Sequence, residues 1–191
     1  MNYTPARAIA EHMLLNLRSY CRRVEIAGSL RREKAVVGDI EVVAIPRIDE
    51  VRDMFGAVQS QRSLLDDFSW GVYGQVLKNG SRYKQIALSE GINLDLFIVL
   101  PPADWGVIYT IRTGPAEFSK WIVTQRFAGG ALPSDCRVMD GHVVRGLIGV
   151  GEYLPMSEEI DFLNFLGIGW VEPCDRQAGL PLKLTGSDLD A

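Results

Sequence analysis

The segment "DIEVVAIP", from Asp39 to Pro46, constrains the fold of this chain most, because it combines an apolar run with two carboxylates. Side chains on a strand alternate between its two faces, so Asp39 and Glu41 lie on one face while Ile40 and Val42 lie on the other. The Cα atoms of the two acids are then about 7 Å apart, a spacing at which they can share a pair of divalent ions. We therefore expect a strand with one apolar face and one acidic face.

A second apolar segment, "INLDLFIVL", carries a third acid, Asp95. A lone charge in an apolar strand is costly unless something compensates it. If this strand lies beside the first, the three carboxylates converge, and two divalent cations about 3.5–4 Å apart would compensate them. Taken alone, an Asp-x-Glu pair is more often a solvated strand face, so the prediction depends on the combination with Asp95 and with the preceding turn.

That turn begins with Gly28-Ser29 and continues into Arg31 and Arg32. Exposed backbone N–H groups and the Ser29 hydroxyl can hold phosphate oxygens at such a turn. Arginine adds forked donors that suit a polyphosphate. A Gly-Ser pair before arginines is by itself more often only a turn, but here it precedes the acidic strand directly.

The remaining pattern alternates helical and strand periodicity. Pro101-Pro102 is the clearest break and predicts a domain boundary. Before this break, the expected elements are a helix from Thr4-Pro5 to about Cys21, strands over Val24–Ala27 and Asp39–Ile45, a helix over Ile48–Val58, and an antiparallel ribbon over Val72–Val99 with turns at Asn79-Gly80 and Glu90-Gly91. After it, they are helices over Asp104–Arg112 and Pro115–Phe127, a hairpin around Asp140-Gly141, a helix capped by Ser157 and ended by Gly167, and an irregular stretch of about fifteen residues at the end.

Composition excludes several classes of site. The 191 residues are 47% apolar and 23% charged, as in an ordinary globular protein, and no apolar run is long enough to span a bilayer. Two histidines, His12 and His142, argue against a histidine-rich zinc site and against a Ser-His-Asp triad. Cys21, Cys136 and Cys174 share no metal-binding spacing, so we expect buried, reduced thiols in a cytoplasmic protein. The net charge of −4 does not itself indicate a nucleic-acid-binding protein.

An apolar residue, Gly28-Ser29, nine further residues, and then Asp39, an apolar residue, Glu41 and a second apolar residue together resemble the signature of the nucleotidyltransferase superfamily. Four longer segments resemble the family X DNA polymerases more specifically, over roughly Val24 to Pro173. These segments are "GSLRREKAVVGDIEVV" and "SRYKQIALSEGINLDLFIV" of that family's palm, "TIRTGPAEFSKWI" of its Thr-Gly helix, and "SEEIDFLNFLGIGWVEP" of its C-terminal domain.

The resemblance implies an α/β (α+β) fold, in which a nucleotidyltransferase palm with a mixed, largely antiparallel sheet and flanking helices occupies residues 1–102. A small α+β domain that contacts nucleotide and DNA would occupy residues 103–191. The implied activity is transfer of dNMP from a dNTP to a DNA primer 3′-hydroxyl, in short gap filling during DNA repair. The partners would be gapped or primed DNA and dNTP, with no membrane, and the protein would be a monomer. Only one helix precedes the palm motif, so no sugar-phosphate lyase activity is expected.

By position, the resemblance makes Asp39, Glu41 and Asp95 the ligands of two Mg²⁺ ions, with Mn²⁺ as an alternative. Asp95 would also lie nearest the primer hydroxyl, either as a base or as a metal-bound orienting group. The implied nucleotide contacts are Gly28, Ser29, Arg32, Gly38, Thr113, Gly114 and Ser119. The expected DNA-phosphate contacts are Arg22, Arg23, Lys78, Arg82 and Lys84, and Lys120 or Arg126 would take the place of a template-side arginine.

Two positions depart from the family pattern. The second acid is Glu41 where most members have aspartate, which alters its reach to a metal. Ile111-Arg112 replaces an aromatic pair that excludes the ribose 2′-hydroxyl, so sugar discrimination is expected to relax. Two other functions stay open: a small nucleotidyltransferase that modifies RNA, a protein or a small molecule, and a non-catalytic nucleic-acid-binding module.

Overall fold

The chain divides into two compact units, and the division does not follow the sequence strictly. The computed structural model describes residues 1–147 and 150–183. The first unit comprises Met1–Ile26 and Ala35–Leu100, and the second comprises Ala27–Lys34 and the chain from Pro101 onward. The predicted boundary at Pro101-Pro102 lies beside this division. Residues 27–34, expected in the first domain, instead group with the second unit.

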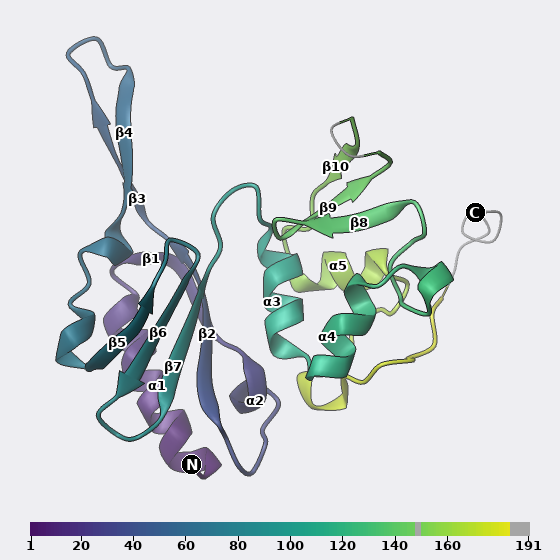
Figure 1. Cartoon of the computed structure of the whole chain (residues 1–191), viewed down its shortest axis with the longest axis horizontal. Helices are drawn as coiled ribbons and strands as arrows, with labels where there is room; N and C mark the ends of the chain where they lie inside the picture. Colours follow the sequence, from purple (N-terminus) through teal and green to yellow (C-terminus); the bar gives the residue numbers. More distant parts are fainter. Residues whose placement is uncertain (148–149, 184–191) are drawn as a thin grey trace. The chain divides into compact units, whose positions relative to one another are not determined.

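A five-stranded sheet forms the centre of the first unit, with the strand order β1-β2-β7-β6-β5 (Figure 1). Its central strands, β2 (Asp39–Pro46) and β7 (Asn93–Ile98), run parallel, and the other neighbours are antiparallel. The prediction of a mixed, largely antiparallel sheet with flanking helices is confirmed. The remaining strands of the sheet are β1 (Cys21–Ile26), β5 (Gly74–Asn79) and β6 (Tyr83–Leu88).

Helix α1 (Tyr3–Leu17) packs against β1 and β2 and contributes Ala6, Ala10 and Leu17 to the core. It begins earlier than the predicted Thr4 cap, with Asn2 at the N-cap. Pro5 is accommodated because the first turn of a helix does not use its backbone N–H groups. The helix ends at Leu17, before the predicted Cys21, because Cys21 already belongs to β1.

Residues 48–58, predicted as a helix, instead form part of a hairpin of β3 (Ile48–Arg52) and β4 (Val58–Ser63) that projects from the sheet (Figure 1). Its turn explains the error. The Asp53 carboxylate accepts hydrogen bonds from the backbone N–H groups of Phe55 and Ala57, both at 2.9 Å, and Gly56 adopts a φ of +83°. Such a local side-chain turn competes with helix formation. Two 3-10 turns follow, η1 (Leu64–Asp66) and η2 (Trp70–Val72).

The second unit combines short helices with a three-stranded antiparallel sheet of order β10-β9-β8 (Figure 1). Its core includes the fully buried side chains of Phe118, Ile122 and Phe162. Its elements are α2 (Gly28–Arg31), α3 (Trp105–Thr113), α4 (Ala116–Val123), η3 (Arg126–Ala128), β8 (Cys136–Met139), β9 (His142–Arg145), β10 (Glu152–Leu154), α5 (Glu159–Phe165) and η4 (Pro173–Asp175).

Several local predictions for this unit can be compared with the structure. The hairpin around Asp140-Gly141 is confirmed, and both turn residues have positive φ, 46° and 82°. Helix α4 is shorter than predicted and is followed by the separate turn η3. The N-cap of α5 is Glu158, not Ser157, because Glu158 and Asp161 form a reciprocal capping box. Residues 184–191 of the expected irregular end lie outside the described residues.

All three cysteines are free thiols, and Cys21 and Cys136 are buried. Cys174 is exposed, so the prediction of burial is wrong for that residue. No helix in the described part of the chain combines the length and the apolar character needed to cross a bilayer.

Candidate functional site

The three predicted acids lie on the two parallel strands at the centre of the first unit. Strands β2 and β7 lie side by side in the sheet (Figure 1). Glu41 of β2 is the register partner of Asp95 of β7, and Asp39 is the partner of Asn93. Residues in register on neighbouring strands project to the same face of a sheet, about 4.8 Å apart. Since Asp39 and Glu41 are two residues apart, all three carboxylates belong to one face.

The acidic face of the sheet is half-buried, whereas the opposite face is buried. Asp39, Glu41 and Asp95 have intermediate exposure. Between them along the strands, Ile40 and Leu94 are fully buried. The alternation that the sequence predicted, apolar on one face and acidic on the other, is therefore present in the sheet.

Asp95 is held by two donors from the neighbouring strand β6. The Tyr83 hydroxyl and the Gln85 side-chain amide each donate to Asp95 Oδ1 at 2.9 Å. Gln85 is the register partner of Asp95, and Tyr83 is two residues away on the same face. Both bonds use Oδ1, so they fix the carboxylate without engaging Oδ2. The sequence reasoning missed both residues, although their alternation in "YKQIAL" would have placed them on the acidic face.

The chemistry of the acids suits a hard divalent cation, because carboxylate oxygens are the ligands that Mg²⁺ prefers. The described residues nevertheless include no group of three or more His, Cys, Asp or Glu side chains arranged to hold a metal ion. The backbone thus brings the acids to one face, while their side chains do not form a ligand set as they stand.

The predicted phosphate-binding turn is α2 of the second unit. Gly28 adopts a φ of +59°, a conformation that glycine tolerates and other residues rarely adopt. The Ser29 hydroxyl oxygen is buried and has no hydrogen-bond partner among the described residues. Buried polar atoms are normally paired with protein, water or a ligand. Ser29 is therefore the residue of this turn that most requires an additional partner.

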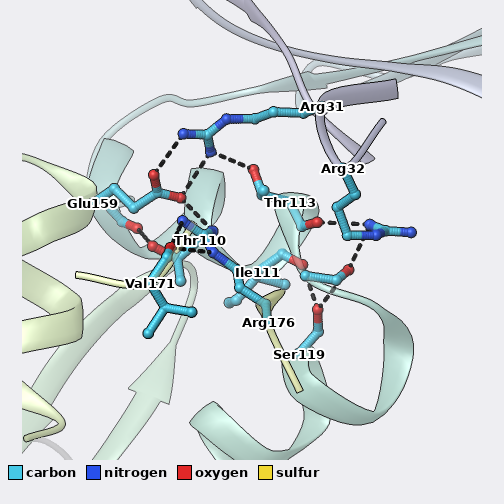
Figure 2. A network of polar contacts seen from close by, with 11 residues as sticks. Arg31, Arg32, Thr110, Ile111, Thr113, Ser119, Glu159, Val171 and Arg176 are labelled. Atoms are coloured by element: carbon cyan, nitrogen blue, oxygen red, sulfur yellow. Dashed lines mark hydrogen bonds and ion pairs between the residues drawn. The ribbon is translucent and has the colours of Figure 1, made fainter. Parts of the chain in front are cut away.

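Arg32 is bonded to two other predicted nucleotide contacts. Its guanidinium donates to the carbonyl oxygens of Thr113, at 2.6 Å, and Gly114, at 3.1 Å (Figure 2). Added bulk at Gly114 is excluded, because a Cβ there would lie 2.3 Å from the Phe118 ring. Phe118 is fully buried, as expected for a core residue. The structure therefore groups Arg32, Thr113 and Gly114, and gives all three a packing role.

Arg31 belongs to an ionic network that the sequence did not reveal. Its guanidinium binds both carboxylate oxygens of Glu159, at 2.7 and 2.9 Å, and donates to the Thr113 hydroxyl at 2.7 Å (Figure 2). Arg176, whose side chain is fully buried, donates to Glu159 at 2.7 Å. Burial raises the pKa of Glu159, but the hydrogen bonds from Arg31 and Arg176 outweigh it and leave that pKa below its usual value. The network fixes α2 within the second unit.

Two other expected nucleotide contacts have simpler surroundings. The Ser119 hydroxyl donates to the Ile111 carbonyl at 2.5 Å and lies 3.3 Å from that of Gly114, so it closes the junction of α3 and α4 (Figure 2). Gly38 is exposed, and an added Cβ would meet nothing within 4 Å. Packing therefore does not explain glycine at position 38.

Some of the expected DNA contacts are surface residues. Arg22 and Lys120 are exposed, and Arg23 is half-buried. Lys78 is also exposed, and its ammonium group lies 5.3 Å from the centre of the Tyr83 ring. Arg82 is exposed and donates to the Leu100 carbonyl at 3.0 Å.

Two further expected DNA contacts form hydrogen bonds within the protein. Lys84 is only 3% exposed, and its ammonium group bonds to the side chains of Asn79 and Asp66. It alternates with Tyr83 and Gln85 and so lies on the buried face, which corrects its assignment as a phosphate contact. Arg126 is half-buried and donates to the carbonyls of Ala131 and Leu166, at 3.2 and 3.4 Å.

No protein-family model and no curated protein matches this chain.

Proposed function

We propose that this protein is a nucleotidyltransferase of the family X DNA polymerase type, which adds dNMP to a DNA primer 3′-hydroxyl. The observation that carries the proposal is the parallel pairing of β2 with β7, which makes Glu41 the register partner of Asp95 and brings Asp39 to the same face. The sequence hypothesis of convergent acids requires that the two strands be neighbours, and their pairing supports it.

The proposed reaction is an in-line attack of the 3′-hydroxyl oxygen on the α-phosphorus of a dNTP. The new phosphodiester bond would form as the bond to pyrophosphate breaks, and the hydroxyl proton would pass to the Asp95 carboxylate or to solvent water. Catalysis in such reactions comes mainly from positioning and from charge neutralisation. Divalent ions, when bound, would supply that neutralisation and lower the pKa of the hydroxyl.

The chain's own residues have distinct proposed roles. Asp95, oriented by Tyr83 and Gln85 through its Oδ1, would act at the primer hydroxyl. Asp39 and Glu41 would share the metal ligation with Asp95. The turn Gly28-Ser29 would bind the triphosphate, and the unpartnered Ser29 hydroxyl supports that role.

Primer extension tests the proposal directly. The substrates are a DNA duplex with a one-nucleotide gap and the same primer without a template strand, each with a labelled dNTP or NTP, with Mg²⁺, Mn²⁺ or EDTA. We expect metal-dependent incorporation on gapped DNA, with NTP accepted measurably because Ile111-Arg112 replaces an aromatic pair. The absence of incorporation with any of these metals and substrates would contradict the proposal.

A further inference from the structure

A hollow lined by four arginines lies on the first unit, along the outer side of β1. Its volume is about 350 Å³, and its charged lining residues are Arg18, Arg22, Arg23, Arg47 and a single carboxylate, Glu25. Leu14, Cys21 and Val24 complete the lining. With four guanidinium groups against one carboxylate, the hollow is strongly cationic.

The fold builds this hollow from irregular features of β1. The strand lies at the edge of the sheet, so among the described strands it has a neighbour, β2, on one side only. Its pairing with β2 skips one residue between Cys21 and Arg23, which makes Arg22 the extra residue of a β-bulge. Bulges redirect side chains, and here consecutive residues of β1 line the same hollow instead of alternating between faces.

Arg47 is held in place by the backbone. Its N–H donates to the Tyr20 carbonyl at 2.9 Å, and its Nε donates to the Cys21 carbonyl at 3.2 Å. Within the described residues, no carboxylate lies within ion-pair distance of Arg18, Arg22 or Arg47. The Arg47 side chain is therefore held in position, and its terminal nitrogens form no ion pair with a carboxylate of the described residues.

We infer that this hollow binds phosphate groups. Guanidinium forks match phosphate oxygens in geometry and charge, and the polar lining offers little to an apolar ligand. Two sources of phosphate fit that chemistry, a DNA strand and a free polyphosphate. The inference that the phosphates belong to DNA rests on the proposed function. The inference that they belong to a free polyphosphate does not.

The variant that tests the inference is R22Q/R47Q, and the charge-matched control is R52Q/R62Q, whose two arginines are exposed on the hairpin. One arm measures pyrophosphate binding by calorimetry in EDTA, which suppresses metal-dependent binding elsewhere. The other arm measures binding of a DNA duplex by fluorescence anisotropy over a series of salt concentrations. Both arms are run in EDTA, and a D49A protein, which alters an exposed carboxylate of β3 outside the proposed catalytic face, should bind both probes as the unaltered protein does.

We expect R22Q/R47Q to weaken binding of at least one probe by tenfold or more. If that probe is DNA, the slope of log affinity against log salt should also shrink by about two. The control should change affinity by less than about twofold. Weaker binding of pyrophosphate alone would identify a free polyphosphate as the ligand of the hollow. Weaker binding of DNA would identify a DNA strand as the ligand.

Unchanged binding of both probes by R22Q/R47Q would overturn the inference and leave the arginines only a role in preventing edge-to-edge strand pairing. An R22K/R47K protein keeps the charge and removes the forks, so it serves if the glutamine variant fails to fold. It should bind the affected probe more weakly than the unaltered protein. Equal binding would also overturn the inference. Primer extension by D39A and D95A tests catalysis separately, so failure of the proposed reaction and failure of this site are distinguishable.

Discussion

Glu41 and Asp95 are register partners on two parallel strands that lie at the centre of the first unit's sheet. Two carboxylates side by side on one half-buried face are the arrangement that the proposed metal ligation needs. Asp95 is in addition held by the Tyr83 hydroxyl and the Gln85 amide.

The first prediction concerns the acids themselves. D39A and D95A should each lower nucleotide incorporation on gapped DNA by at least about 100-fold, because each removes a proposed ligand or base. Both variants should stay folded, although D95A should unfold at a slightly lower temperature because Tyr83 and Gln85 lose their acceptor. D49A, which removes an exposed carboxylate of β3, is the matched control and should leave incorporation unchanged. Full activity in D39A or D95A would refute the assignment.

Tyr83 and Gln85 are positioning residues for Asp95, and Y83F tests this role. The substitution removes one hydrogen bond to the carboxylate while keeping the ring, so we expect kcat to fall about tenfold. KM for dNTP should stay within about twofold, because the residue does not contact the nucleotide in the proposed arrangement. A change confined to KM would contradict a positioning role.

The ionic network around Glu159 should contribute strongly to folding. R176M removes one of its two arginine partners at a fully buried position. Breaking a buried ion pair from one side typically costs about 3–5 kcal/mol, and we expect a loss of that order in the free energy of unfolding in urea. E152Q, at an exposed position in β10, should change it by less than about 0.5 kcal/mol. Equal stability of R176M and the unaltered protein would show that the network is dispensable.

The same carboxylate predicts a pH dependence. The folded state lowers the pKa of Glu159 below its ordinary value of 4.5, so the unfolded chain binds this proton at higher pH than the folded chain does. The stability that Glu159 contributes is therefore complete above about pH 4.5 and is lost as the pH falls through the lowered pKa. Urea unfolding between pH 3 and pH 7 should show this decline, and E159Q should flatten it. An equally steep decline in E159Q would assign it to other groups.

Thiol reactivity should separate the three cysteines. Burial raises the pKa of Cys21 to about 12 and that of Cys136 to about 11, whereas Cys174 is exposed. Thiolate is the reactive form, so one thiol should react rapidly with a disulfide reagent at pH 8, and all three should react in denaturant. C174S should abolish the rapid phase. Rapid reaction of three thiols in the native protein would contradict the burial of Cys21 and Cys136.

The sequence predicted the central features of the first unit because they depend on local alternation. Asp39, Glu41 and Asp95 lie on one face for the same reason that Ile40 and Leu94 lie on the other. Alternation also explains the error at Lys84, whose neighbours Tyr83 and Gln85 belong to the acidic face. The positive charge of Lys84 led to its prediction as a surface residue. Its place between Tyr83 and Gln85 in the strand puts it on the buried face instead.

Other features could not be predicted because they depend on distant residues. Arg31 and Glu159 are 128 positions apart, and no periodicity in either segment indicates the pairing. The hairpin at residues 48–63 escaped prediction for a local reason, since the Asp53 side chain organises a turn that helical spacing does not reveal. Whether the three acids share a metal depends on side-chain positions that a strand pattern does not determine.

The polypeptide leaves the first unit after Ile26, contributes α2 to the second, and returns at Ala35. A fragment that stops at Leu100 would keep Arg31 but lose Glu159, and the complementary fragment would keep Glu159 but lack Arg31. Neither half is therefore self-sufficient, and cutting the gene at Pro101 would give two incomplete pieces with unmatched charges. Dissection of this protein requires point substitutions in the intact chain.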